Sequence, residues 1–145
     1  MKARDLMTPD PAQVTPSDSL QRVSQLMAEH DCGCIPVVTA ADQRSLVGVV
    51  TDRDIAIRAV AEGRPATTPV GDIMTPNPDC VTPDDEVERV EKLMSDRQIR
   101  RVVVVDEAGE CVGIIAQADL ARAAKRRNDP SPKEMVDVLE KISQP

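Results

Sequence analysis

The chain of 145 residues contains no Trp, Tyr or Phe, and only one histidine. Its core must therefore be built from aliphatic side chains and methionine, and any bound base has to sit between aliphatic groups. No nucleophile–histidine–acid set can be assembled, and no glycine-rich phosphate loop of the ATPase type is present. We therefore expect a protein that is not an enzyme.

An excess of basic residues is also missing. The formal net charge is −7 and the sequence pI is about 4.7, which argues against non-specific nucleic-acid binding. No apolar run approaches the roughly 20 residues that cross a bilayer. The first residues, Met1 to Asp5, lack the apolar segment of a signal peptide. We expect a cytoplasmic protein without a membrane partner, and four cysteines that stay reduced.

What the chain does have is an internal repeat. The segment Asp-Leu-Met-Thr-Pro at 5–9 returns as Asp-Ile-Met-Thr-Pro at 72–76, and Val-Thr-Pro at 14–16 returns at 81–83. Further on, Gly-Val-Val-Thr-Asp-Arg-Asp at 48–54 matches Gly-Ile-Ile-Ala-Gln-Ala-Asp at 113–119. Because each half alone would bury little surface, we expect the two halves to share one core.

The first copy predicts two helices and a hairpin. Ser17 to Ser19 offer helix caps, and the apolar positions that follow lie on one helical face as far as about His30. Two apolar runs, 35–38 and 46–50, predict strands joined by the polar stretch 39–45. A helix from about Asp52 to Ala61 follows. A short strand at 13–15 would complete the order strand, helix, strand, strand, helix.

The second copy repeats this order. Its helix carries Val87, Val90, Leu93 and Met94, its strands are predicted at 102–105 and 111–115, and its last helix at about 117–127. A short strand at 80–82 precedes them.

These elements divide the chain into repeat 1 at 1–64, repeat 2 at 65–127 with a linker at 65–69, and an extension at 128–145. The extension contains an amphipathic helix, Lys133 to Ile142, whose apolar stripe must pack on this body or on a partner subunit.

The strongest local signal is the turn at 48–54. A strand ends, Thr51 offers a hydroxyl, and Asp54 lies three residues into a helix. A helix N-terminus with free backbone N–H groups favours an anion, and a carboxylate can accept two hydrogen bonds from a ribose diol. Thr51 and Asp54 also match a capping box, which would only start the helix. Both interpretations stay open from spacing alone.

The ordered motifs resemble a known family. The Met-Thr-Pro start, the Ile-Pro-Val-Val strand at 35–38 and the Gly-x-x-Thr-x-x-Asp ending are similar to the cystathionine β-synthase (CBS) domain. Two copies resemble a CBS pair, or Bateman module, over about residues 1 to 127, and small stand-alone proteins of the hypoxic-response type in particular. The resemblance implies an α+β fold in which two CBS repeats pack with pseudo-two-fold symmetry, beside a C-terminal helix.

The resemblance also implies a ligand, an adenosine nucleotide of the AMP, ADP or ATP type, with no obligatory cofactor. Asp54 would hold the ribose and Thr51 the phosphate, while Arg100 or Arg101 would bring a guanidinium to the phosphate. Because neighbouring strand residues point to opposite faces, at most one of the two arginines should reach it. The remaining residues implied at the adenine are Ala12, Cys32, Gly33, Cys34, Ile35 and Pro36.

The second copy departs from this pattern. Asp119 could hold a ribose, but Ala116 supplies no hydroxyl, which removes a donor worth roughly 1.5–3 kcal/mol to a charged group. We therefore expect a weaker or empty second site. Its residues, placed by the repeat, are Asp119, Ala116, Asp79, Ile99 and Val102.

The implied mechanism is that of a regulatory sensor. A nucleotide held by residues of both copies would change their arrangement, a homodimer would display the change, and an unknown effector protein would respond to it. Two alternatives remain: a scaffold that binds other proteins without a ligand, and a thiol- or metal-responsive protein that uses Cys32 and Cys34. We expect no metal site, because Cys80 and Cys111 do not form a matching pair of ligands.

Overall fold

The computed structural model describes residues 1–126 and 140–142, and these form two compact units. Unit 1 consists of Met1–Pro9, Asp79–Asp106 and Val112–Pro145, and unit 2 of Asp10–Pro78 and Glu107–Cys111. The mixed helix and strand composition with two repeats confirms the expected α+β class. The expected pseudo-two-fold relation between the copies stays a prediction.

Unit 2 contains a sheet with the order β2-β3-β4. Strands β2 (Cys34–Val38) and β3 (Leu46–Thr51) form the predicted antiparallel hairpin, and β4 (Thr75–Pro76) lies along β3. Helix α2 (Leu20–His30) begins at Ser19, whose side chain accepts from Arg22 N as expected. The expected strand at 13–15 is only a single parallel bridge from Val14 to Val37.

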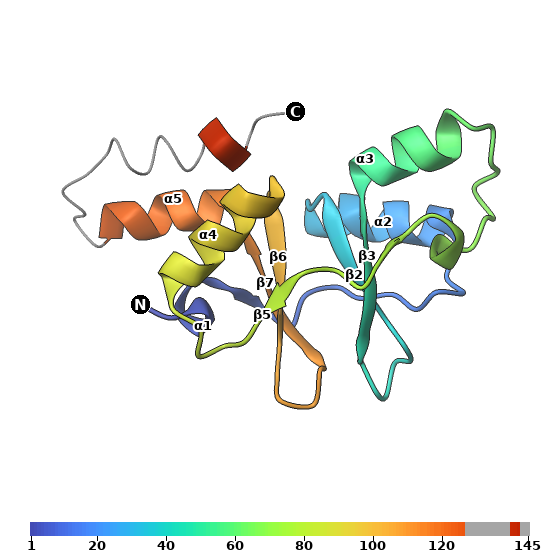
Figure 1. Ribbon diagram of the computed structural model, residues 1–145. Coiled ribbons are helices and arrows are strands. Elements are labelled where there is room, and N and C mark those ends of the chain that lie inside the picture. The colour runs from blue at the N-terminus through green and yellow to red at the C-terminus, as the bar shows by residue number, and fades with distance from the viewer. Residues whose placement is uncertain (127–139, 143–145) are drawn as a thin grey trace. The chain divides into compact units, whose positions relative to one another are not determined.

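Unit 1 builds the same arrangement in the order β1-β7-β6-β5, of which β5, β6 and β7 are labelled in Figure 1. Its strands are β1 (Thr8–Pro9), β5 (Cys80–Val81), β6 (Arg101–Val105) and β7 (Cys111–Ala116). Helix α4 (Val87–Arg97) contributes the apolar side chains predicted for it, and α5 (Gln117–Arg126) contributes Leu120. The second copy therefore has the full predicted element order.

The helix after β3 differs from our expectation of an ordinary α-helix. Only Asp52–Asp54 (α3) is α-helical, and Ile55–Val60 (η1) is a π-helix. Hydrogen bonds run from Ala61 N to Ala56 O and from Arg64 N to Ala59 O, each five residues back. The spacing of the apolar residues does not distinguish an α-helix from a short π-helix, because in both forms these residues lie on one face.

The Met-Thr-Pro segments are exchanged between the repeats. β1, from the first repeat, pairs with β7 of the second, and β4, from the second, pairs with β3 of the first. Each unit is thus completed by a strand from the other repeat, and its boundaries differ from the repeat boundaries at 64 and 65. A short 3-10 helix, η2 (Val70–Asp72), precedes β4, as α1 (Ala3–Leu6) precedes β1.

Glycine permits this close approach of the exchanged strands. A Cβ atom at position 48 would lie 2.6 Å from the Sδ atom of Met74 and 3.0 Å from the carbonyl oxygen of Thr75. At position 113 it would collide with the side chain of Met7. A larger residue at position 48 would therefore push the Met-Thr-Pro strand away, whereas at position 113 it would displace the side chain of Met7.

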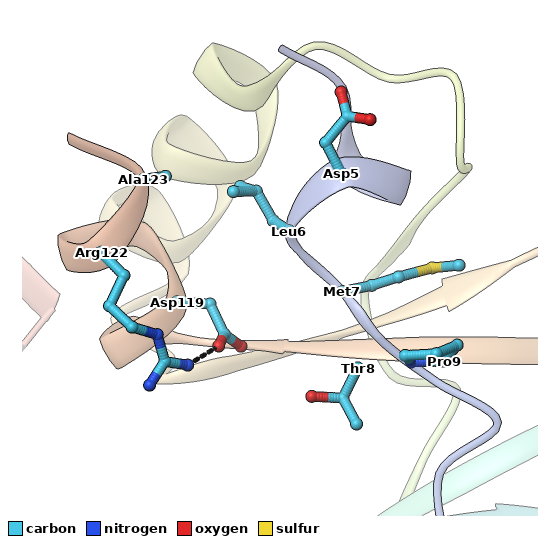
Figure 2. Close-up of a pocket in the computed structure, with 8 residues that line it drawn as sticks. All are labelled: Asp5, Leu6, Met7, Thr8, Pro9, Asp119, Arg122 and Ala123. Atoms are coloured by element: carbon cyan, nitrogen blue, oxygen red, sulfur yellow. Dashed lines mark hydrogen bonds and ion pairs between the residues drawn. The ribbon is translucent and has the colours of Figure 1, made fainter. Parts of the chain in front are cut away.

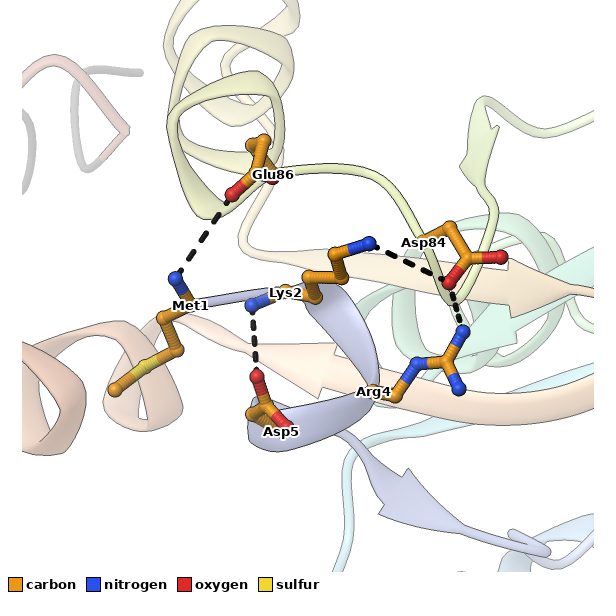
Figure 3. A network of polar contacts seen from close by, with 6 residues as sticks. All are labelled: Met1, Lys2, Arg4, Asp5, Asp84 and Glu86. Carbon is orange, nitrogen blue, oxygen red and sulfur yellow. Dashed lines mark hydrogen bonds and ion pairs between the residues drawn. The ribbon is translucent and has the colours of Figure 1, made fainter.

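The N-terminal segment is attached to unit 1 by polar as well as apolar contacts (Figure 3). Arg4 pairs with Asp84, and the amino group of Met1 lies 3.8 Å from Glu86. Ala3 is fully buried, and its N–H donates to the carbonyl oxygen of Asp85 at 2.8 Å. The surface ion pairs contribute little on their own, so burial and backbone pairing hold the segment.

Two apolar cores, rather than the single shared core that we expected, are formed by the described residues. One joins α2, β2, β3 and the segment 70–73, and the other joins α1, α4, α5 and strands β5 to β7. The exchange gives each unit extra buried side chains, such as Ile73 in unit 2 and Ala3 in unit 1. Each sheet therefore has a core of its own.

The predicted C-terminal helix from Lys133 to Ile142 lies mostly outside the described residues. Of its apolar stripe, Ile142 is described, is 1% exposed and belongs to the core of unit 1. Of the two expected positions for the apolar stripe, this body or a partner subunit, Ile142 therefore occupies the first.

Candidate functional site

The turn after β3 is a reciprocal capping box. Thr51 N donates to Asp54 Oδ2 at 3.0 Å, and Asp54 N donates to Thr51 Oγ1 at 3.1 Å. Thr51 ends strand β3 as the N-cap of α3, so the sheet positions the hydroxyl and the helix positions the carboxylate. The capping interpretation of these two residues is confirmed.

The expectation of free backbone N–H groups at this turn is wrong. Asp52 N donates to Gly33 O at 3.0 Å, and Arg53 N donates to Asp52 Oδ1 at 2.8 Å. Together with the Asp54 amide, the first three N–H groups are satisfied by the chain itself. An anion at this turn would have to be held by side chains.

Side-chain capacity remains in the capping box. The Thr51 hydroxyl accepts one hydrogen bond and can still donate its own hydrogen. Asp54 is 16% exposed, accepts one backbone bond through Oδ2, and has Oδ1 3.7 Å from Arg58 Nε. A carboxylate has about four lone-pair sites, so Asp54 can still accept from two hydroxyl groups.

Arg58 spans from this carboxylate to the exchanged segment. Its Nη1 atom donates to the carbonyl oxygen of Ile73 at 3.2 Å, while its Nε lies near Asp54. Sequence reasoning did not single out Arg58. The signal was its place four residues after Asp54, one turn along the same helix face.

The other residues expected at the first site differ in exposure. In the β2–β3 register Cys34 lies opposite Thr51, and the Gly33 carbonyl meets the start of α3. The side chain of Ile35, however, is fully buried in the core of unit 2, and Pro36 is buried as well. Ala12 and Cys32 are half-buried.

The two arginines lie at the entrance to β6 in unit 1. Arg100 is exposed and its carbonyl oxygen accepts from Gln117 N at 2.9 Å, while Arg101 begins the strand and is half-buried. Neither guanidinium has a hydrogen bond or ion pair with another described residue. Their charge is therefore not neutralised by a neighbouring carboxylate of the described chain.

In the second copy, the carboxylate alone forms the turn. Ala116 N donates to Asp119 Oδ2 at 2.7 Å, and Asp119 Oδ1 pairs with Arg122. Gln117 N meets the carbonyl oxygen of Arg100 as Asp52 N meets that of Gly33. The turn thus keeps its backbone geometry without the hydroxyl.

A cavity of about 370 Å³ lies beside Asp119 within unit 1 (Figure 2). Asp119 is only 11% exposed, and Thr8, from the exchanged strand, lines the same cavity. The full lining is Asp5, Leu6, Met7, Thr8, Pro9, Asp119, Arg122 and Ala123. Sequence reasoning found Asp119 but missed residues 5–9, because their exchange onto β7 is a tertiary event.

The other residues expected at the second site lie elsewhere in unit 1. Asp79 Oδ2 is 3.5 Å from Arg97 Nε, Val102 is in the core, and Ile99 packs against the core. None of these three lines the cavity beside Asp119. The structure therefore brings together Ala116 and Asp119 from this set.

None of the four cysteines forms a disulfide bond. Burial raises the pKa of the Cys80 thiol above its ordinary value of 9.0, the Asp79 and Asp85 carboxylates raise it further, and Arg89 opposes them. Within residues 1–126 and 140–142, no group of three or more His, Cys, Asp and Glu side chains could hold a metal ion.

None of the described helices combines the length and the apolar character needed to cross a membrane.

Comparison with protein families gives two matches to the CBS domain, at residues 3–60 and 70–126. The chain belongs to the CBS domain family. Both matches contain the strand-to-helix turn with its aspartate, Asp54 in one and Asp119 in the other. Family membership therefore rests on both copies of the repeat.

Individual relatives agree. The chain is 42% identical over 118 residues to "CBS domain-containing protein YhcV" of Bacillus subtilis, covering 81% of each chain. It is 35% identical over 121 residues to "Hypoxic response protein 1" of Mycobacterium tuberculosis, covering 83% of this chain and 82% of that protein. The resemblance to hypoxic-response-type proteins is thereby confirmed.

Solved structures of CBS pairs share the fold. A crystal structure of Hypoxic Response Protein I, with two coordinated zinc ions, has a TM-score of 0.75 at 34% identity and covers 84% of this chain and 98% of that one. A structure of CBSX2 in complex with AMP has a TM-score of 0.76 at 30% identity, with 88% and 98% coverage.

Proposed function

We propose that this CBS pair is a regulatory module that binds an adenosine nucleotide of the AMP, ADP or ATP type and catalyses no reaction. The observation that carries the proposal is the turn at Thr51 and Asp54, where a hydroxyl that can still donate its hydrogen lies beside a carboxylate that keeps acceptor capacity after its contacts with Thr51 N and Arg58. The AMP bound to the related CBSX2 supports this ligand class.

Each functional group has a role in the proposal. Asp54 accepts the two ribose hydroxyls, and the Thr51 hydroxyl donates to a phosphate oxygen. Arg58, 3.7 Å from Asp54, holds the carboxylate in place. Because the backbone amides of the turn are occupied, the negative charge of the phosphate needs a cation from elsewhere in the chain.

Arg100 or Arg101 supplies that cation in our proposal. Both guanidinium groups lack a carboxylate partner among the described residues, and a guanidinium can bind a phosphate through two parallel hydrogen bonds. The adenine is assigned to the segment Cys32–Pro36 and to Ala12. Since the Ile35 side chain is in the core, Ile35 contributes backbone groups only.

The second copy contributes a weaker site in this scheme. Asp119 accepts from a ribose, and Ala116 leaves the phosphate without the hydroxyl donor. Its other assigned residues are Asp79, Ile99 and Val102. Regulation follows if the nucleotide binds one arrangement of a cytoplasmic homodimer more tightly than another, and an effector protein recognises that arrangement.

Isothermal titration of the whole chain with AMP, ADP and ATP tests the proposal. Asp54→Asn keeps an oxygen for the Thr51 amide but removes the charge, and we expect it to weaken nucleotide binding by about tenfold or more. The matched control is Asp119→Asn, which removes the same charge from the second copy and should leave the main site intact.

The outcomes separate the site from the function. If the wild-type chain binds none of the three nucleotides, the ligand-binding function is wrong and the scaffold alternative gains support. If nucleotides bind but Asp54→Asn has no effect, the function stands and the site is wrong. A loss of affinity in Arg100→Gln or Arg101→Gln, but not in both, would identify the arginine that meets the phosphate.

A further inference from the structure

A second cavity, in unit 2, is separate from the turns at Asp54 and Asp119. Its volume is about 300 Å³, at the lower end for ligand pockets, and it suits a small molecule. Apolar groups of Val14, Val38 and Ala41 contribute to it, and Val14 and Val38 are buried. The other lining residues are Pro11, Gln13, Thr15, Asp18 and Arg44.

The cation of this cavity comes from the longer hairpin loop of the first copy. Arg44 lies in the connection between β2 and β3, and Arg44 N and Thr39 N form the hydrogen bonds that close this loop. Its Nε donates to Gln13 Oε1 at 3.0 Å, and its Nη2 lies 2.5 Å from Asp10 Oδ1. A guanidinium has five donors, so three remain.

The ion pair with Asp10 leaves Arg44 accessible to a ligand. The Asp10 side chain is 80% exposed, and exposed pairs of this kind contribute little free energy. A carboxylate in the cavity could therefore bind Arg44 beside Asp10 or in its place. The Gln13 contact fixes the plane of the guanidinium, which favours a planar, bidentate anion.

The anion of the cavity is Asp18, and it has no cation of its own. Asp18 Oδ2 accepts from Thr15 N at 2.8 Å, but no ion pair joins Asp18 to another described residue. Arg22, one turn along α2, instead lies 3.9 Å from Glu29. The charge on Asp18 is thus available to an ammonium group.

The second copy shows that this arrangement is not required by the fold. Asp85 forms the same turn, accepting from Thr82 N at 2.8 Å, but it is paired with Arg89 at 3.3 Å. The shorter loop at 106–110 has no basic residue. In the first copy, by contrast, one cavity combines the carboxylate of Asp18, the guanidinium of Arg44 and several apolar side chains.

We infer that this cavity binds a free α-amino acid with a short side chain. The carboxylate of the amino acid would bind Arg44, its ammonium group would bind Asp18, and its side chain would contact Val14, Val38 and Ala41. A zwitterion would neutralise both the Arg44 guanidinium and the Asp18 carboxylate, whereas a simple anion or cation would leave one of them without a counter-charge. The cavity therefore favours a zwitterion. This site goes beyond the proposed nucleotide function and does not depend on it.

Isothermal titration of the whole chain with L-alanine, L-serine and L-valine tests the inference. We expect saturable binding of at least one of the three at a single site. Propionate lacks the ammonium group and ethylamine lacks the carboxylate, so each should bind at least about tenfold more weakly than L-alanine if L-alanine is the ligand. If none of the three amino acids binds at concentrations up to about 10 mM, the inference is overturned, because a Kd above this range is too weak for a specific site.

Two variants and a matched control locate the site. Asp18→Asn keeps an acceptor for Thr15 N, and Arg44→Asn suits the positive φ of 51° at this position, so both should fold. Each should weaken amino-acid binding by about tenfold or more. Asp85→Asn, in the corresponding turn of the second copy, should have no effect.

Unchanged binding in Asp18→Asn or Arg44→Asn contradicts the inference, as does propionate binding as tightly as the amino acid. The comparison of amino acids with propionate and ethylamine uses only the wild-type chain, so it decides the question even if a variant fails to fold. AMP titration of the same variants should be unaffected, which separates this site from the proposed nucleotide site.

Discussion

At the end of β3, Thr51 and Asp54 cap the helix for each other, whereas at the end of β7 Asp119 performs this task without a hydroxyl from residue 116. Both turns retain the backbone bond to the preceding strand, through Gly33 in one copy and Arg100 in the other. The carboxylate is therefore sufficient to form the turn. The Thr51 hydroxyl adds a cap and, in our proposal, a donor for phosphate.

The helices that follow these turns differ as well. In the first copy the residues after Asp54 form the π-helix η1, while in the second copy α5 continues as an α-helix. Leu120 is fully buried, but Ile55 at the corresponding position is only half-buried. The same repeat thus places corresponding apolar residues at different depths.

The largest effect should come from this difference in burial. Leu120→Ala should lower the free energy of unfolding by about 2–5 kcal/mol, because it leaves a cavity in the core of unit 1. Ile55→Ala removes a half-buried side chain and should cost roughly half as much. Urea denaturation of both variants measures the two values, and equal losses would contradict the unequal packing.

The second largest loss of stability should come from substitutions that crowd the exchanged strands. Gly48→Ala and Gly113→Ala should each destabilise the chain by about 1–3 kcal/mol, because the new methyl group meets the Met-Thr-Pro strand. Gly48→Ala should cost more, since one of its contacts is the backbone oxygen of Thr75, whereas the side chain of Met7 can move. Adding Met7→Ala should restore part of the loss in Gly113→Ala.

Exchanging the hydroxyl between the copies sharpens the comparison of the turns. Thr51→Ala should lower the free energy of unfolding by about 1 kcal/mol, and Ala116→Thr should raise it by about 0.5–1 kcal/mol, as each change removes or adds an N-cap. The denaturation midpoints show the effect. A loss of stability in Ala116→Thr would mean that the second turn cannot accommodate a capping side chain.

The smallest effect concerns Cys80, at a position where the first copy has Gln13. Its raised pKa means less thiolate at pH 8, so alkylation in the folded chain should be slower than that of free cysteine. The thiol binds its proton more tightly in the folded chain than in the unfolded chain. The protonated thiol therefore contributes to the free energy of unfolding below pH 9.0, and this contribution is lost as the pH rises above that value. Mass spectrometry of labelled peptides measures the rate, and faster labelling in Asp79→Lys would support the contribution of Asp79.

Most elements of the fold followed from local patterns. The apolar spacing at 20–30 and 87–97, the cap at Ser19 and the strand predicted at 35–38, observed at 34–38, agree with prediction because each depends on neighbouring residues. The π-helix at 55–60 did not follow, because a shift in hydrogen bonding by one residue leaves the apolar face nearly unchanged.

The candidate site was predicted in part. Thr51, Asp54 and Asp119 were found because the repeat places them at the same turn, and their mutual hydrogen bonds are local. Arg58 and the cavity residues 5–9 were missed, since their positions depend on pairing between distant segments. Ile35 was assigned to a ligand site, but its side chain fills the core.

The sequence by itself determined the duplication, the order of elements within each copy and the loss of a hydroxyl at Ala116, because repetition and short-range periodicity are visible along the chain. Only the tertiary structure decided that each Met-Thr-Pro strand completes the sheet of the other repeat, that the turn amides at 52–54 are already occupied, and that Asp18 and Arg44 share a cavity. These outcomes depend on which distant backbone and side-chain groups meet, and packing, rather than any local preference, selects those partners.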